Sequence, residues 1–304
     1  MHCPEVTVVI RAAGERTEAL CRALVLREVA EKDVFVLHER PFARAVRRNF
    51  EIGAAQGKPW TLAVDADVLL REGAISQMIE RVKNLPSAIR KKTYVYQGRV
   101  HCRVFGQPRR AGLHLYQTET LPTALKFVDD KTADIRPESA TYTLMQKKGF
   151  YHIRSNDLYG LHDYHQSYAA LFRNGFFQAR KHLSQAGTLL EYWTTEAHDD
   201  FRVLLAGWNH SLTTRQTHRL ERVGIDEIKA LTEQAFQQLN LFEKPPLTAT
   251  DTARIQQETE EICTVAPRPF QWQRHRHRRV FPGADLLRQT GNQLEKLGKK
   301  LQRV

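Results

Sequence analysis

The 304-residue sequence has few cysteines and no long apolar segment. Its four cysteines lie at positions 3, 21, 102 and 263 without any C-x-x-C spacing, and Cys21 falls on the apolar face of an expected helix. A reducing compartment therefore fits best. There is no run of about 18 apolar residues and no charged-then-apolar leader at the N-terminus. We expect a cytoplasmic protein that neither spans a membrane nor carries a signal peptide.

The sequence also has no excess of acidic residues and no familiar nucleic-acid-binding motif. Lysine and arginine total 46 against 34 aspartates and glutamates, which gives a formal net charge of +12. Such a surface attracts phosphates, acidic glycans, anionic lipid head groups or nucleic acid. An Arg/His cluster spans 274–279, but no helix-turn-helix, zinc finger or aromatic ribonucleoprotein pattern accompanies it. No specific nucleic-acid partner is expected, and a basic nucleic-acid-binding protein is the nonenzymatic alternative.

The composition is that of a folded enzyme, with 41% hydrophobic and 26% charged residues. We find no internal repeat. The distribution of strand-like and helix-like segments predicts three regions. These are a catalytic α/β domain over 1–190, a helical appendage over 191–264 and a basic tail over 265–304.

Strand-like and helix-like segments alternate in the first half of the chain, which predicts a sheet with helices on its faces. Strands are expected over 6–10, 34–37, 60–64, 68–70, 94–105 and 112–116, and helices over 17–31, 43–56, 73–85, 137–148 and 164–182. A polar turn is expected over 106–110 and a short loop before Gly160. The later helices, over 226–241 and 251–261, flank the breaker Pro245-Pro246.

Two carboxylates follow the third strand directly. The buried run Thr61-Leu62-Ala63-Val64 leads into Asp65-Ala66-Asp67. Acids separated by one residue at an exposed strand end suit a hard divalent cation, Mn²⁺ or Mg²⁺, held beside a diphosphate. The plainer interpretation of so short a pattern is a solvated turn.

In context, this motif resembles that of the GT-A nucleotide-diphospho-sugar glycosyltransferases, especially family-2-like members. The similarity covers roughly residues 5 to 185 and rests on three segments: Val6-Thr-Val-Val-Ile10, Arg48-Asn49 with Gly53 and Gly57, and Trp60-Thr-Leu-Ala-Val-Asp-Ala-Asp67. It implies a GT-A, Rossmann-like mixed sheet with a helical C-terminal extension. It also implies hexosyl transfer from a UDP- or GDP-sugar to a glycan or lipid-linked acceptor, as in surface-polysaccharide biosynthesis. In such enzymes the second carboxylate, here Asp67, binds the metal directly. The first, here Asp65, contacts the ribose or donor sugar, or the metal through water.

The resemblance further implies a donor site beside the first two strands. Its expected residues are Arg11, Ala12, Glu15, Glu39, Arg48, Asp65 and Ala66, with Arg44 one helical turn before Arg48. Arg11 departs from the common family-2 form, which has proline after the first strand. The alternatives are a surface arginine at 11, a loop carboxylate at 39 and a solvated basic face at 44 and 48.

A second motif, Gly160-Leu-His-Asp-Tyr-His165, follows the core elements. Many GT-A enzymes use a late histidine as a further metal ligand, and imidazole is a reasonable ligand for manganese. We expect His162 in this role, with Asp163 orienting its imidazole. The alternative is a structural histidine that binds no metal.

An inverting transfer needs a carboxylate that takes a proton from the acceptor hydroxyl. Glu138, which follows Pro137 at a helix start, resembles the acidic residue in that place in inverting members, and Asp134 is the next choice. Glu138 would otherwise only complement the helix dipole. A retaining enzyme requires no such base. Acceptor contacts are expected from His114, Tyr116 and Tyr159, although tyrosines in such segments often lie in the core.

The last segment has leucines 287, 294, 297 and 301 at helical spacing among lysines and arginines. This pattern is typical of a helix on an anionic membrane surface, which would make the protein a peripheral enzyme at the inner face. Docking onto the protein body or a second subunit is the alternative. A nucleotidyltransferase is the second enzymatic alternative, but Arg11-Ala-Ala-Gly14 is a poor phosphate loop.

Overall fold

The computed structural model describes residues 2–128, 137–213 and 225–264. They fall into two compact units. The first comprises the chain up to Ser167 together with the segment from Lys244 through helix α11 (Ala249–Thr264), and the second runs from Tyr168 to Glu243. The expected boundary lies at residue 190, and the expected appendage includes α11. In the structure the helical unit starts earlier and α11 belongs to the first unit.

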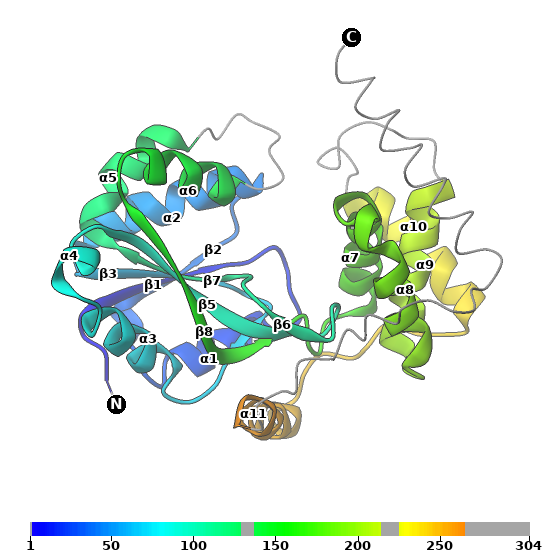
Figure 1. The fold of residues 1–304 in the computed structure, drawn as a ribbon. Coiled ribbons are helices and arrows are strands. Elements are labelled where there is room, and N and C mark those ends of the chain that lie inside the picture. Colours follow the sequence, from blue (N-terminus) through cyan, green and yellow to red (C-terminus); the bar gives the residue numbers. More distant parts are fainter. Residues whose placement is uncertain (1, 129–136, 214–224, 265–304) are drawn as a thin grey trace, which may run out of the picture. The chain divides into compact units, whose positions relative to one another are not determined.

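The first unit is built on one mixed sheet (Figure 1), with strand order β2-β1-β3-β7-β5-β8-β4 and β6 paired to β5. The strands are β1 (Val6–Arg11), β2 (Val34–Leu37), β3 (Trp60–Asp65), β4 (Val68–Leu70), β5 (Thr93–Cys102), β6 (Gln107–Arg109), β7 (Leu113–Gln117) and β8 (Tyr151–His162). β1 pairs in parallel with β2 and β3. β7 pairs antiparallel with β3, and β4 pairs antiparallel with β8.

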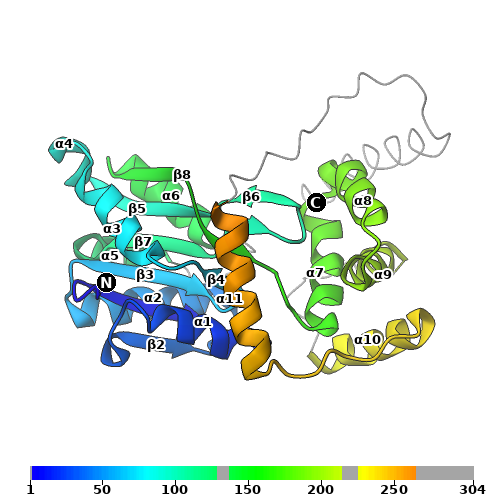
Figure 2. The same ribbon diagram turned by 90° about the horizontal axis from the view of Figure 1, so that it is seen from below.

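Helices cover both faces of this sheet (Figures 1 and 2). One face carries α2 (Phe42–Gln56), α5 (Leu121–Ala124) and α6 (Pro137–Lys147); the other carries α1 (Glu18–Val25), α3 (Ala74–Lys83) and α11 (Ala249–Thr264). The short α4 (Ser87–Arg90) precedes β5. Because the sheet is buried on both sides, β1 is apolar and branched along almost its whole length. The α/β class with a mixed sheet flanked by helices is confirmed.

Two segments differ from the expected elements. β8 occupies the place of the expected short loop, and β6 lies within the expected polar turn. The sequence of β8 contains Ser155-Asn156-Asp157, residue types that disfavour strands, so its pairing with β5 and β4 decides the conformation. Asp163 and His165 then adopt positive φ angles of 63° and 55°. This backbone ends the strand, and α7 begins only at Tyr168.

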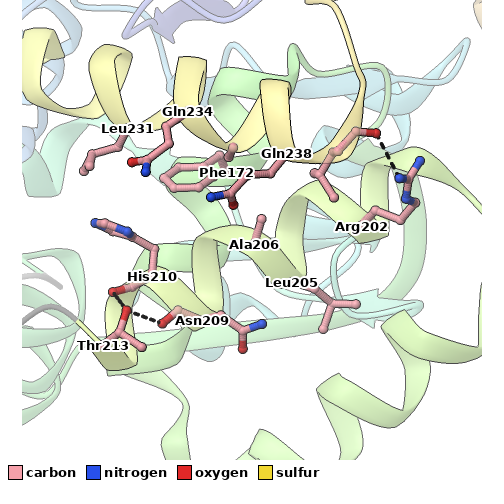
Figure 3. A pocket seen from close by; sticks show the side chains of 12 residues that line it. Phe172, Arg202, Leu205, Ala206, Asn209, His210, Thr213, Leu231, Gln234 and Gln238 are labelled. Atoms are coloured by element: carbon pink, nitrogen blue, oxygen red, sulfur yellow. Dashed lines mark hydrogen bonds between the residues drawn. The ribbon is translucent and has the colours of Figure 1, made fainter.

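The second unit is helical, with α7 (Tyr168–Lys181), α8 (Ala186–Thr195), α9 (Asp199–Thr213) and α10 (Ile225–Leu239). α7 and α9 pack closely because a glycine lies at each side of the contact. A Cβ atom on Gly175 would lie 2.1 Å from the Leu204 carbonyl oxygen, and one on Gly207 would lie 2.0 Å from that of Phe172. A cavity of about 550 Å³ opens between α7, α9 and α10, and Phe172 is among the side chains that line it (Figure 3).

In the part of the chain that the structure describes, no helix is long and apolar enough to cross a membrane. The leucine-striped segment near the C-terminus lies outside the described residues, so its expected membrane contact stays a prediction.

Candidate functional site

The acidic pair lies where β1 and β3 end side by side. In the parallel register Arg11 is the neighbour of Asp65. The Ala66 N–H donates to the Arg11 carbonyl at 2.9 Å, and the Asp65 N–H donates to the Gly112 carbonyl at 2.8 Å. The backbone of three strands therefore fixes the turn at the carboxyl edge of the sheet, the usual place for a ligand site in an open α/β sheet.

Arg11 is buried and joins two carboxylates. Its Nε and Nη2 contact Asp65 Oδ1 at 2.8 and 2.7 Å, and its Nη1 contacts Glu138 Oε1 at 2.6 Å. The guanidinium carbon also lies 4.9 Å from the centre of the Phe42 ring. Burial disfavours the charge, yet Asp65 and Glu138 raise the pKa of Arg11 above its ordinary value. Arg11 is thus an internal ion-pair partner and not a surface arginine.

Glu138 stands at the start of α6 and accepts a further hydrogen bond at the same oxygen. The Tyr116 hydroxyl donates to Oε1 at 3.1 Å, and His114 Nδ1 lies 3.4 Å from it. Burial by itself would raise the pKa of Glu138, but Arg11, then His114, and the hydrogen bonds lower it to about 2. Glu138 is therefore a charged carboxylate throughout the neutral range.

A buried polar chain leads away from Glu138. His114 Nε2 lies 2.9 Å from Gln97 Nε2, and Gln97 Oε1 lies 3.0 Å from His152 Nε2. Because an amide nitrogen only donates, His114 Nε2 accepts and its proton resides on Nδ1, facing Glu138. Burial lowers the pKa of His114, which keeps the ring neutral. The chain orients a donor toward the carboxylate.

The other carboxylate of the motif, Asp67, meets the end of β8. Strand β4 pairs with β8 so that Val68 neighbours His162, and the Asp163 N–H donates to the Asp67 carbonyl at 3.2 Å. His162 Nε2 then lies 3.6 Å from Asp67 Oδ1, while Nδ1 lies 2.9 Å from Asp163 Oδ2. Cys102 Sγ is 3.4 Å from both Asp163 Oδ2 and His162 Nδ1. The two motifs expected from the sequence are thus brought together.

The chemistry of this group fits a divalent cation. Among the described residues, Asp67 Oδ1 is a buried oxygen without a hydrogen-bond partner. Burial, together with Asp163 and Asp65, raises the pKa of Asp67, and the surrounding carboxylates raise the pKa of His162 against the effect of burial. The ionised carboxylates therefore repel one another, and a bound cation would relieve that repulsion. One carboxylate oxygen and one imidazole nitrogen face each other, as two ligands of Mn²⁺ or Mg²⁺ would.

The remaining expected donor residues lie in the turns after β1, β2 and β3 and on α2. Ala12 and Ala66 are buried, and Glu15 accepts the Ala13 N–H at 2.5 Å. On the outer side, Arg44 pairs with Glu39 at 3.0 Å and Arg48 with Glu51 at 3.3 Å. The exposed arginines of α2 therefore have carboxylate partners of their own.

The three expected acceptor residues are buried in the protein. His114, Tyr116 and Tyr159 are at most 2% exposed. His114 and Tyr116 hold Glu138, and Tyr159 bonds the Tyr96 hydroxyl at 2.9 Å within the core. None of the three side chains is accessible in this structure, so their expected acceptor contact stays a prediction. Asp134 lies outside the described residues.

Several site residues escaped the sequence interpretation. Phe42 is 40% exposed beside Arg11, and Cys102 and Gln97 are buried next to His162 and His114. Phe42 has one signal, an aromatic residue opening the helix after the second strand. Cys102 and Gln97 have no such signal in the sequence. Each joins a polar network only because the sheet places it beside residues of neighbouring strands.

No family model matches the chain, and no curated protein matches it. A glycosyltransferase involved in the glycosylation of the major capsid of PBCV-1 is 13% identical with a TM-score of 0.35, over 50% of this chain and 82% of its own. The mannosyltransferase PcManGT from Pyrobaculum calidifontis, solved in complex with GDP-Man and Mn²⁺, is 12% identical with a TM-score of 0.37, over 79% and 88%. At these sequence identities and TM-scores, neither structure assigns an activity to this chain.

Proposed function

We propose that the first unit is a GT-A glycosyltransferase that transfers a sugar from a nucleoside diphosphate to an acceptor hydroxyl. The observation that carries this proposal is the convergence of Asp65, Asp67 and Glu138, with Arg11 and His162, at one edge of the sheet. A transfer of this kind needs a place for a diphosphate and its counter-charge, and a carboxylate beside the acceptor.

Asp67 and His162 would hold a divalent cation, which supplies positive charge to the leaving diphosphate. Asp65 has a different part. Its Oδ1 is taken by Arg11, so its remaining oxygen is left for the ribose or donor sugar. Phe42 presents an exposed ring at the same edge, suited to stack on the nucleobase.

Glu138 is the base in this proposal. Its Oε1 is occupied by donors, and among the described residues no hydrogen bond is made to Oε2. Oε2 takes the acceptor proton as the hydroxyl oxygen attacks the anomeric carbon and the bond to the diphosphate breaks. A pKa near 2 keeps the group charged but makes it a weak base. A bound diphosphate would share the charge of Arg11 and raise that pKa.

The alternatives have less support. A two-metal nucleotidyltransferase needs both acids for cations, whereas Arg11 already neutralises Asp65. The Arg/His cluster that motivates nucleic-acid binding lies outside the described residues.

The test is donor binding, measured by thermal stabilisation with UDP-, GDP- and CMP-sugars, with and without Mn²⁺. We expect one donor to stabilise the protein only with the metal, and Asp67→Asn to abolish the effect. Glu31→Gln is the matched control, because Glu31 is an exposed carboxylate at the amino end of β2, the end of the sheet opposite the site. Absence of any response in the unaltered protein would refute the proposal.

A further inference from the structure

Three arginines gather around the irregular middle of β8. Arg99 lies on β5, Arg110 follows β6, and Arg154 lies on β8 beside Gln97 of β5. Arg99 Nη1 donates to the Asn156 carbonyl at 3.1 Å. Arg110 Nη2 donates to the Asn156 side chain at 3.0 Å and to the Ser155 carbonyl at 2.8 Å. The register of β5 and β8 shifts on either side of Arg99, and Arg99 and Arg110 both reach Asn156, two residues beyond Arg154.

This arginine cluster has no carboxylate partner among the described residues. Arg99 and Arg110 contact only neutral oxygens, and no ion pair involves Arg154. By contrast, the nearby Arg81 pairs with Asp157 at 2.7 Å. Burial lowers the pKa of Arg110, and the charges of Arg99 and Arg154 lower it further. Three like charges held together without compensation are unfavourable, and a bound anion would remove that cost.

A chain of polar side chains connects the arginine cluster with the candidate base. His152, on the same strand as Arg154, begins the polar chain that reaches Glu138 through Gln97 and His114. Gln97 Nε2 also lies 3.4 Å from the Arg110 carbonyl. Burial, then Arg154, lowers the pKa of His152 to about 4. An anion on these arginines would therefore be linked to Glu138 through this chain of side chains.

We propose that Arg99, Arg110 and Arg154 bind a phosphate group of the acceptor. The proposal rests on the proposed function and names the substrate class: an alcohol whose attacking hydroxyl lies near a phosphate monoester or diphosphate. Guanidinium groups suit phosphate because their paired N–H donors match its oxygens. Such a group is present both on lipid-linked acceptors and on sugar phosphates, and the arginines recognise the chemistry that the two share.

The test is binding of farnesyl phosphate and glucose 1-phosphate, with farnesol and glucose as uncharged counterparts, by calorimetry at fixed ionic strength. We expect at least one phosphate probe to bind and its uncharged counterpart not to. The double variant Arg110→Gln/Arg154→Gln should weaken that binding about tenfold or more. Preference for the farnesyl or the glucosyl probe identifies the source of the phosphate. Both side chains are exposed, so the fold should be retained.

The matched control is Arg27→Gln/Lys32→Gln, which removes the same charge from exposed residues at the amino end of the sheet. Equal weakening in this control, or no binding of either phosphate probe by the unaltered protein, would overturn the proposal. Metal-dependent donor binding is measured in parallel. If the donor binds and the phosphate probes do not, only the acceptor proposal fails; if the donor does not bind, the proposed function fails. Loss of donor binding in the double variant would assign the arginines to the donor and contradict the acceptor role.

Discussion

His162 Nδ1 lies 2.9 Å from Asp163 Oδ2, and this contact turns the opposite nitrogen, Nε2, toward Asp67. A carboxylate on one side of an imidazole fixes the tautomer that leaves the other nitrogen free for a cation. Asp163 is itself buried and held by an unusual backbone angle, φ 63°. It therefore acts on the proposed metal site through His162.

We expect Asp163→Asn to weaken Mn²⁺ binding about 10- to 100-fold, because the amide cannot hold His162 with the same charge and geometry. Calorimetric or paramagnetic titration of Mn²⁺ measures this without any turnover. Asp157→Asn removes a carboxylate that pairs with Arg81 away from His162 and should leave the affinity unchanged. Unaltered Mn²⁺ affinity in Asp163→Asn would show that His162 is oriented by other contacts.

Glu138→Gln should abolish sugar transfer while the donor still binds within about a factor of 2, because the amide keeps the shape but takes no proton. Single-turnover assays with the identified donor measure the transfer, and thermal stabilisation measures donor binding. Tyr116→Phe removes only one hydrogen bond to Glu138 and should reduce transfer far less. Full activity in Glu138→Gln would favour a retaining mechanism, which needs no base.

Glu138 also makes stability depend on pH. Its pKa is about 2 in the folded protein against an ordinary 4.5, so its contribution is present above about pH 4.5 and is lost as the pH falls toward 2. The difference corresponds to about 3 kcal/mol. Urea unfolding at pH 7, 4 and 3 should show a steeper acid loss in the unaltered protein than in Glu138→Gln. If the free energy of unfolding fell equally with pH in the two proteins, the ion pair between Glu138 and Arg11 would be contradicted.

Gly207→Ala should destabilise the helical unit by about 1–3 kcal/mol, because the new methyl group meets the Phe172 carbonyl and forces α9 away from α7. Gly187→Ala is the control, since a Cβ there meets nothing within 4 Å. Thermal unfolding followed by circular dichroism compares the two. Equal melting temperatures would mean that α7 and α9 do not pack as closely as described.

Much of the fold was predictable because its signals are local. The apolar runs of β1 and β3 predict buried strands, and Asp65-Ala66-Asp67 follows β3 as expected. β8 was not predictable, since its polar middle becomes a strand only between β5 and β4. The same holds for the boundary of the helical unit, where positive φ angles at Asp163 and His165 delay the next helix.

The sequence by itself determined the α/β class, the position of the acidic pair and the residue types available for a cation. Only the tertiary structure decided what those residues contact. Arg11 is bound between Asp65 and Glu138, residues 54 and 127 positions away, and the arginine cluster draws on three separate strands and turns. Local sequence sets backbone preference and burial, whereas ion pairing depends on which distant segments the sheet brings into register, and that is a property of the packed whole.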